Sequence, residues 1–338
     1  MKKTLALVLF VAACGGSSDS DYKTDVVTGM HDSISVDLQA LIDAAKALQT
    51  AAPDHAWDAT ADADAIAQMT AAWRNARIAY EHVEGATAPI FPDEDVSMDE
   101  RYDGFLAALG PDGDPNLFDD EGVTGMHAIE RILFAPTIRA EVTEFEAQLP
   151  GYTPAAWPAT AAEATDFKTK LCQKLIDDAQ QLHDEWTPAN IDVGAAFQGL
   201  VGLMNEQKEK VNLAATGEEE SRYANWTLFD LHNNLAGTMK IYDLFQPWVV
   251  SKGGNEDDNI QLGFGKLDGL YSTTSGDALP PVPATWSSDN PSATDLATPF
   301  GMMWQGVHAA VDPTADGSVV FEMNEAAVKL GFPQFVEE

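Results

Sequence analysis

The sequence predicts an all-α protein, built as two packed helical bundles of about four helices each. Apolar residues recur at spacings of three and four along several long segments, which is the period of an amphipathic helix. The strict alternation of a half-buried strand does not occur over several residues in the sequence. Hairpin dipeptides between β-branched runs are also missing.

The N-terminal residues predict export from the cytoplasm. Lys2 and Lys3 precede an uncharged apolar stretch over residues 5–13, which is typical of a secretory signal peptide. This stretch is well short of the roughly 20 residues that cross a bilayer as a helix. We therefore predict a cleavable signal peptide at residues 1–13.

Cys14 is the candidate lipidation site. Ala12 and Ala13 stand directly before it and resemble a bacterial lipoprotein box, in which the cysteine becomes the lipidated N-terminus. Residues 14–32 are then a lipidated N-terminus and flexible linker, which tethers the protein to a lipid bilayer of the cell envelope, facing the periplasm or the outer-membrane surface. The alternative is a secreted protein with a free cysteine.

The predicted helices follow in order along the mature chain. Their apolar stripes cover residues 33–52, 66–83, 167–186, 197–213 and 226–245. A break rich in proline and glycine over residues 149–158 predicts the division between the bundles. The first bundle would span residues 33–150, and the second would span residues 151–338.

Charge excludes one class of partner. The formal net charge is −35, and removal of Lys2 and Lys3 would make it −37. Such a surface repels nucleic acid and anionic lipid headgroups, and it concentrates cations. Charge alone predicts no site, because acidic surfaces also keep proteins soluble.

The segment over residues 125–134, GMHAIERILF, carries the first candidate ligands. His127 and Glu130 are three residues apart on a predicted helix, so both side chains leave the same face. An earlier helix repeats this spacing with Glu81 and Glu84. Two carboxylates that close repel one another, and a bound cation would remove the penalty.

Together, these four side chains predict a nitrogen-plus-oxygen pocket if the two helices are neighbours. One imidazole among carboxylates suits iron, zinc or manganese. The alternative is an ordinary solvated helix face, since HxxE spacing also arises by chance. The HExxH signature of zinc peptidases, which needs two histidines and a glutamate base, is absent.

Two separated segments resemble the imelysin family. GMHAIERILF is similar to the family's GxHxxE motif, and residues 216–245 are similar to a downstream stretch in which a glycine and acidic run precedes a long helix. The family includes insulin-cleaving membrane peptidases and EfeO-type periplasmic components of iron uptake. The resemblance covers roughly residues 33–248. This sequence departs from the EfeO branch in a long acidic insert over residues 110–121. Residues of this insert are open as further metal ligands.

The resemblance implies a set of metal ligands. His127 and Glu130 come first, with Glu84 and Glu81 beside them. Asp99 is a further oxygen donor, with a helix N-cap as its alternative role. Glu206 aligns loosely with an acidic position of the family that faces the site from the second half of the chain. The alternative role of Glu206 is a surface acid.

Two functions remain from the resemblance. The first is an envelope-anchored lipoprotein that binds a divalent or trivalent metal ion, iron before zinc, and takes part in iron uptake. Its partners would be a metal ion or iron chelate and a membrane iron-transport protein. The second is an imelysin-type metallopeptidase, which is less favoured because the sequence marks no base beside the ligands. An adhesin or polysaccharide binder stays open as a third class.

Overall fold

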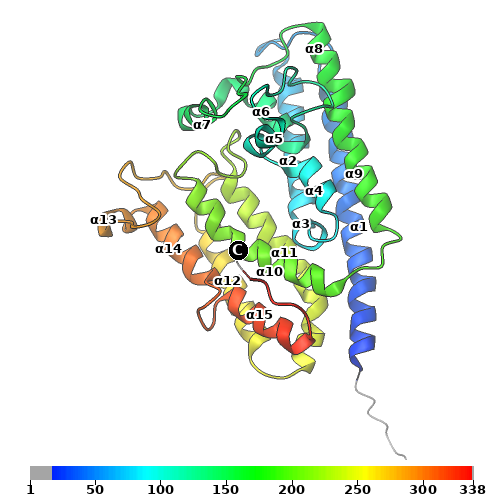
Figure 1. Cartoon of the computed structure of the whole chain (residues 1–338), viewed down its shortest axis with the longest axis vertical. Helices are drawn as coiled ribbons and strands as arrows, with labels where there is room; N and C mark the ends of the chain where they lie inside the picture. The colour runs from blue at the N-terminus through cyan, green and yellow to red at the C-terminus, as the bar shows by residue number, and fades with distance from the viewer. Residues whose placement is uncertain (1–16, 337–338) are drawn as a thin grey trace, which may run out of the picture.

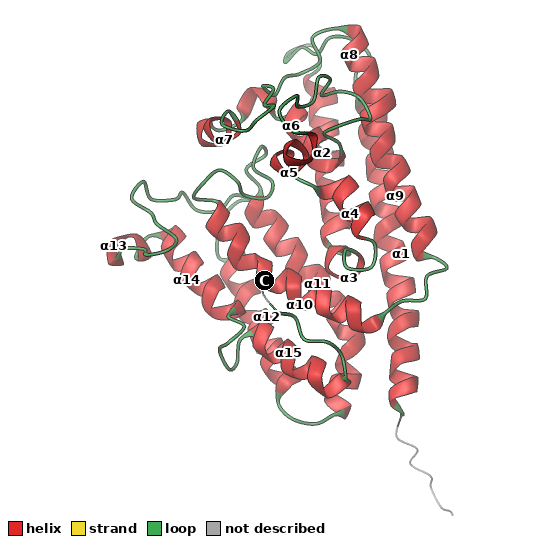
Figure 2. Cartoon of the chain, viewed as in Figure 1, coloured by secondary structure: helices red, strands yellow, loops and turns green. Residues whose placement is uncertain are grey.

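The computed structural model describes residues 17–336, and over these residues it contains helices and loops but no strand (Figure 2). The all-α prediction is therefore confirmed. The predicted signal peptide and Cys14 lie outside the described residues. None of the helices described combines the length and the apolar character that crossing a bilayer requires.

The helices follow the chain in the order shown in Figure 1. Their bounds are α1 Asp19–Ala51, α2 Ala63–Glu81, α3 Glu84–Thr87, α4 Pro92–Asp99, α5 Tyr102–Leu109, α6 Gly125–Leu133, α7 Ala140–Glu146, α8 Ala161–Asp166, α9 Cys172–Trp186, α10 Val193–Leu213, α11 Thr227–Ser251, α12 Glu256–Ser272, α13 Ala293–Leu296, α14 Pro299–Val311 and α15 Val319–Leu330. A 3-10 turn at Ala135–Thr137 and a π-helical turn at Phe167–Leu171 complete them.

Helix α1 begins much earlier than the sequence predicts. The expected linker over residues 14–32 is helical from Asp19 onward, so this expectation was wrong for most of its length. Ser18 caps the helix and forms a capping box with Asp21. Val26 and Met30 are buried and extend the apolar stripe toward the N-terminus, which explains why the helix continues there.

The helices divide into two groups at a later point than residue 150. Helix α9, which the sequence places in the second bundle, packs along α1 and also contacts α4 and α6. Its stripe, including Leu175 and Leu182, is buried in that group. The break over residues 149–158 is a connection within the first group, where the Trp57 amide donates to the Pro158 carbonyl at 3.0 Å. The second group contains α10, α11, α12, α14 and α15.

The two groups meet along α10 and α11, as Figure 1 shows. Helix α10 packs on α3, and α11 packs on α1, α2 and α3. The loop over residues 214–226, which joins α10 to α11, therefore runs beside the helices of the first group. This junction positions the site described next.

Candidate metal centre

The segment that carries His127 and Glu130 forms helix α6, and all nine of its residues are buried. The interpretation of a solvated helix face is therefore wrong. The Nδ1 atom of His127 lies 2.8 Å from Oε2 of Glu130. The Trp73 indole of α2 donates to the Met126 carbonyl at 2.9 Å, which fixes α6 against its neighbour.

Glu130 links α6 to the loop between α10 and α11. Its second oxygen, Oε1, accepts hydrogen bonds from the backbone amides of Tyr223 at 3.0 Å and Ala224 at 2.8 Å. Both oxygens of Glu130 are thus engaged by protein groups. The carboxylate orients the His127 ring and holds the loop at the same time.

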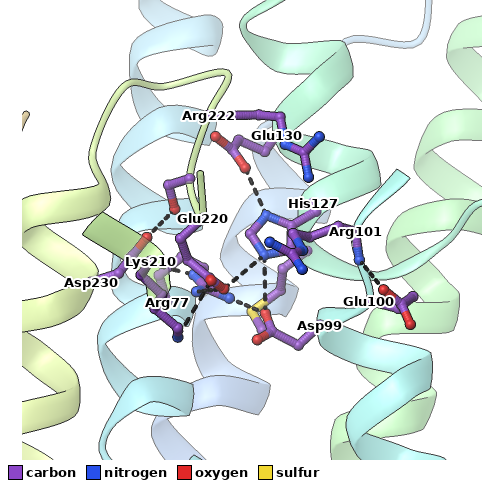
Figure 3. Close-up of polar contacts among 12 residues, drawn as sticks. Arg77, Asp99, Glu100, Arg101, His127, Glu130, Lys210, Glu220, Arg222 and Asp230 are labelled. Carbon is purple, nitrogen blue, oxygen red and sulfur yellow. Dashed lines mark hydrogen bonds and ion pairs between the residues drawn. The ribbon is translucent and has the colours of Figure 1, made fainter. Parts of the chain in front are cut away.

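The other ring nitrogen of His127 faces two carboxylates (Figure 3). Its Nε2 atom lies 3.5 Å from Oδ1 of Asp99 and 3.4 Å from Oε1 of Glu220. It has no hydrogen-bond partner among the described residues, although His127 is only 1% exposed. Ligand atoms of Asp99, His127 and Glu220 all lie within 4.8 Å of one another. A nitrogen and two carboxylate oxygens at this spacing suit a first-row transition metal.

Gly125 allows this approach. It adopts a φ of 79°, which favours glycine, and a Cβ atom there would lie 2.5 Å from the Met98 carbonyl oxygen. The start of α6 can therefore lie directly against the end of α4. Asp99 is the last residue of α4, so it meets His127 and is not a helix N-cap.

Arg77 is the central cation of the site. It is fully buried on α2, and its guanidinium donates to Asp99 and Glu81. The same group lies 3.4 Å from Glu220 and 3.6 Å from Asp230. One guanidinium thus contacts four carboxylates, two of which belong to the group around His127.

Glu81 and Glu84 lie next to the His127 group and are not part of it. The Asn234 amide of α11 donates to both carboxylates, with 2.7 Å to Glu84. Glu81 also accepts from Arg77, so both of its oxygens are engaged. Gly237 allows α11 to come this close, since a Cβ atom there would lie 2.5 Å from Cα of His82.

We define the acidic centre as Arg77, Lys210, His127 and five acids: Glu81, Asp99, Glu130, Glu220 and Asp230. The Lys210 ammonium lies 3.3 Å from Oε2 of Glu220. With every acid ionised, the five carboxylates outnumber the two permanently basic groups by three. A buried excess of this kind must be neutralised by protons or by a bound cation.

The pKa values reflect this excess. Burial raises the pKa of Asp99 to about 7. Burial and the Arg77 charge act to lower the pKa of His127, but the Glu130 hydrogen bond and the carboxylates of Glu220 and Asp99 raise it to about 9. Protons therefore neutralise part of the excess near neutral pH.

The pKa of Glu220 shifts in the opposite direction to that of Asp99. Burial alone would raise its pKa, but Lys210, His127 and Arg77 together hold it well below its usual range. Glu220 was not predicted from the sequence, because it lies in the loop between α10 and α11, where no helical periodicity marks it. Its one signal was membership of the acidic run Glu218, Glu219 and Glu220 in the second segment that resembles the imelysin family.

A cavity of about 300 Å³ leads to this group from the surface. Two basic side chains, Arg101 and Lys210, line it. Seven carboxylates also line it, from Glu84, Asp95, Asp99, Glu100, Glu206, Glu209 and Glu220. Glu206 therefore faces the same cavity as Asp99 and Glu220, and the predicted acids Glu84 and Asp99 share it.

The acidic insert before α6 forms its own loop. The two oxygens of Asp114 accept hydrogen bonds from the amides of Asn116 at 2.9 Å and Val123 at 3.0 Å. Among the residues described, the cluster with ligand spacing contains no acid of this insert. The insert shapes the approach to α6.

Comparison with known sequences gives a consistent result. The sequence profile described as Imelysin matches residues 35–274. Proteins named Efem/EfeO family lipoprotein, from several Staphylococcus aureus strains, are 29% identical over 205 residues, which is 61% of this chain. The chain spans 58% of the length of these curated relatives.

Two crystal structures share the fold. An imelysin-like protein from Psychrobacter arcticum superposes with a TM-score of 0.57 at 12% identity, covering 94% of this chain and 98% of the other. A proposed iron-regulated protein A precursor from Parabacteroides distasonis superposes with a TM-score of 0.60 at 14% identity, covering 94% and 97%. At these identities the likeness concerns the fold alone.

Proposed function

The chain belongs to the imelysin family, and on this basis we propose that it is an envelope lipoprotein that binds iron and takes part in iron uptake. The observation that carries the proposal is the Nε2 atom of His127. It is buried, lacks a hydrogen-bond partner among the described residues, and faces Asp99 and Glu220 at 3.5 and 3.4 Å. A buried polar atom without a partner is costly unless a ligand satisfies it.

The proposed ligands are Asp99, His127 and Glu220. Glu130 acts behind them, because its bond to Nδ1 leaves Nε2 free for a metal and fixes the ring orientation. Such carboxylate and histidine pairs are the usual support of a histidine ligand. Glu81 and Glu84, placed against Asn234, lie beside the proposed ligands.

The choice of metal follows from the donor atoms. One imidazole and two carboxylates suit iron, and zinc binds the same atoms. Three protein ligands leave coordination positions for water or for a further donor from the cavity. Iron is the proposed substrate because several curated relatives are named Efem/EfeO family lipoproteins, and the sequence resembles the EfeO branch of iron-uptake components.

The proposed location rests on two supports. The sequence around Cys14 resembles a lipoprotein box, and the curated relatives are named lipoproteins. The protein would be tethered to the bilayer through Cys14, with a membrane transport protein as the recipient of its iron.

Metal titration tests the proposal. We expect mature protein purified without chelators to bind anaerobic Fe²⁺ and Zn²⁺ tightly, with one ion per chain by metal analysis. The His127→Ala variant should bind at least about 100-fold more weakly, a loss of roughly 3 kcal/mol. The His232→Ala variant is the matched control, because His232 is exposed and pairs with Asp268 at 3.0 Å away from the centre.

Two results would contradict the proposal. Equal affinity in the wild type and in His127→Ala would place the metal elsewhere. Chelator-sensitive cleavage of unfolded casein that disappears in His127→Ala would instead identify a metallopeptidase.

A further inference from the structure

The cavity that leads to the acidic centre indicates the form in which the metal arrives. We propose that it admits the metal as an uncomplexed hydrated cation and rejects anionic metal chelates, with Glu206 and Glu209 capturing the ion. This inference rests on the proposed function and specifies its substrate.

The charge of the walls favours a cation. Seven carboxylates and two basic groups line the cavity. Both basic groups already have partners: the Lys210 ammonium lies 3.3 Å from Glu220 and from the Asn234 amide oxygen, and Arg101 donates to the Glu218 carbonyl at 3.0 Å. A cavity whose walls carry an excess of one sign of charge concentrates ions of the opposite sign and repels ions of the same sign.

The size of the cavity fits a hydrated ion. A volume of about 300 Å³ corresponds to roughly ten water molecules at about 30 Å³ each. A metal ion with six water molecules fits within it. A bulky chelate would have to displace this water and place its own carboxylates against those of the walls.

The acids form a path of increasing burial. Glu209 is exposed on α10, and Glu206, one turn earlier on the same face, is partly buried. Asp99 and Glu220 have side chains that are only 9% and 8% exposed. An ion that enters beside Glu209 and Glu206 can exchange waters stepwise for carboxylate oxygens before it reaches His127.

The expected effect of the outer acids is kinetic. A dication about 8 Å from one carboxylate in water is stabilised enough to raise its local concentration about fivefold. Burial raises the pKa of Glu206 to about 7, so the comparison is made at about pH 8, where this carboxylate is ionised. Removal of both outer charges should then slow association about tenfold or more at low ionic strength. The effect should shrink as salt screens the charges.

Stopped-flow binding of cobalt(II) tests the inference, with visible absorption reporting the coordination of the ion. The probes are aqueous Co²⁺ and its anionic nitrilotriacetate complex, each added to wild type and to Glu206→Gln/Glu209→Gln. The control is Glu141→Gln/Glu144→Gln, which removes two exposed acids at the same spacing on α7, outside this cavity.

We expect aqueous Co²⁺ to bind about tenfold more slowly to Glu206→Gln/Glu209→Gln and at the wild-type rate to the control. The intact nitrilotriacetate complex should not bind. Equal rates in the two double variants, or binding of the anionic complex as fast as the free ion, would overturn the inference. Loss of equilibrium binding in His127→Ala reports separately on the proposed function, so the two can fail independently.

Discussion

Two adjacent residues of α6 belong to two different buried charge clusters, and the clusters differ in their ratio of acidic to basic groups. Glu130 belongs to the acidic centre, whereas Arg131 belongs to a second group, which we call the balanced cluster. In the balanced cluster Arg131 pairs with Glu146 at 3.0 Å, and Arg222 pairs with Asp103 at 2.7 Å. Two cations thus face two carboxylates.

The two clusters are buried to the same extent and differ in their excess of carboxylates. Arg131 and Glu146 are 2% and 1% exposed, as deeply buried as His127 and Glu130. The guanidinium of Arg131 also lies 3.8 Å from the ring centre of Tyr102, which adds a cation–π contact. Burial of ion pairs therefore does not identify a binding site. The informative features are the excess of carboxylates and the Nε2 atom of His127, which has no hydrogen-bond partner within residues 17–336.

The largest expected effect is a loss of stability when the balanced cluster is disrupted. Glu146→Gln leaves the Arg131 charge buried without its carboxylate, so we expect the free energy of unfolding to fall by about 3–5 kcal/mol. Chemical denaturation measures this loss. Metal affinity should change by less than about tenfold. A variant with normal stability and lost metal affinity would show that the two clusters have the opposite roles.

The next effect concerns the support of His127. Glu130→Gln keeps the shape of the side chain and weakens its hold on Nδ1, so metal affinity should fall about 10- to 100-fold. Calorimetric titration with Zn²⁺ measures the change. Glu144→Gln on the exposed face of α7 is the control. An unchanged affinity would mean that the ring needs no carboxylate to orient it.

The last prediction concerns the pH dependence of metal affinity in the unmutated protein. The pKa of Asp99 is raised to about 7 and that of His127 to about 9. Both groups therefore hold protons near neutral pH that a metal must displace, so affinity should rise with pH between 6 and 9. The slope should reach about tenfold per pH unit for each proton released. A Zn²⁺ affinity that stays constant over this pH range would contradict the expected release of protons from Asp99 and His127 on metal binding.

The periodic features were predictable from the sequence, and the site was predictable in part. Apolar stripes gave the helix class because burial on one face imposes a repeat of 3.6 residues. His127 and Glu130 were recognisable because their spacing places them on one face of a helix. Asp99 was recognised by family resemblance, and its contact with His127 depends on the close approach at Gly125.

Other parts of the site have no local signature. Glu220 meets His127 across a long sequence separation, in a loop that Glu130 holds through two backbone amides. Arg77 and Glu81 are four residues apart, a spacing equally typical of an exposed ion pair on a helix surface. Their burial arises from α11 and the loop before it, which no pattern within α2 specifies.

Arg77 has a consequence for the release of an ion. Its guanidinium contacts Asp99, Glu81 and Glu220 directly. If a metal ion binds and leaves as proposed, these carboxylates keep a permanently charged neighbour of opposite sign, so their mutual repulsion stays compensated. We therefore expect the arrangement of the proposed site to persist through repeated binding and release of a metal ion.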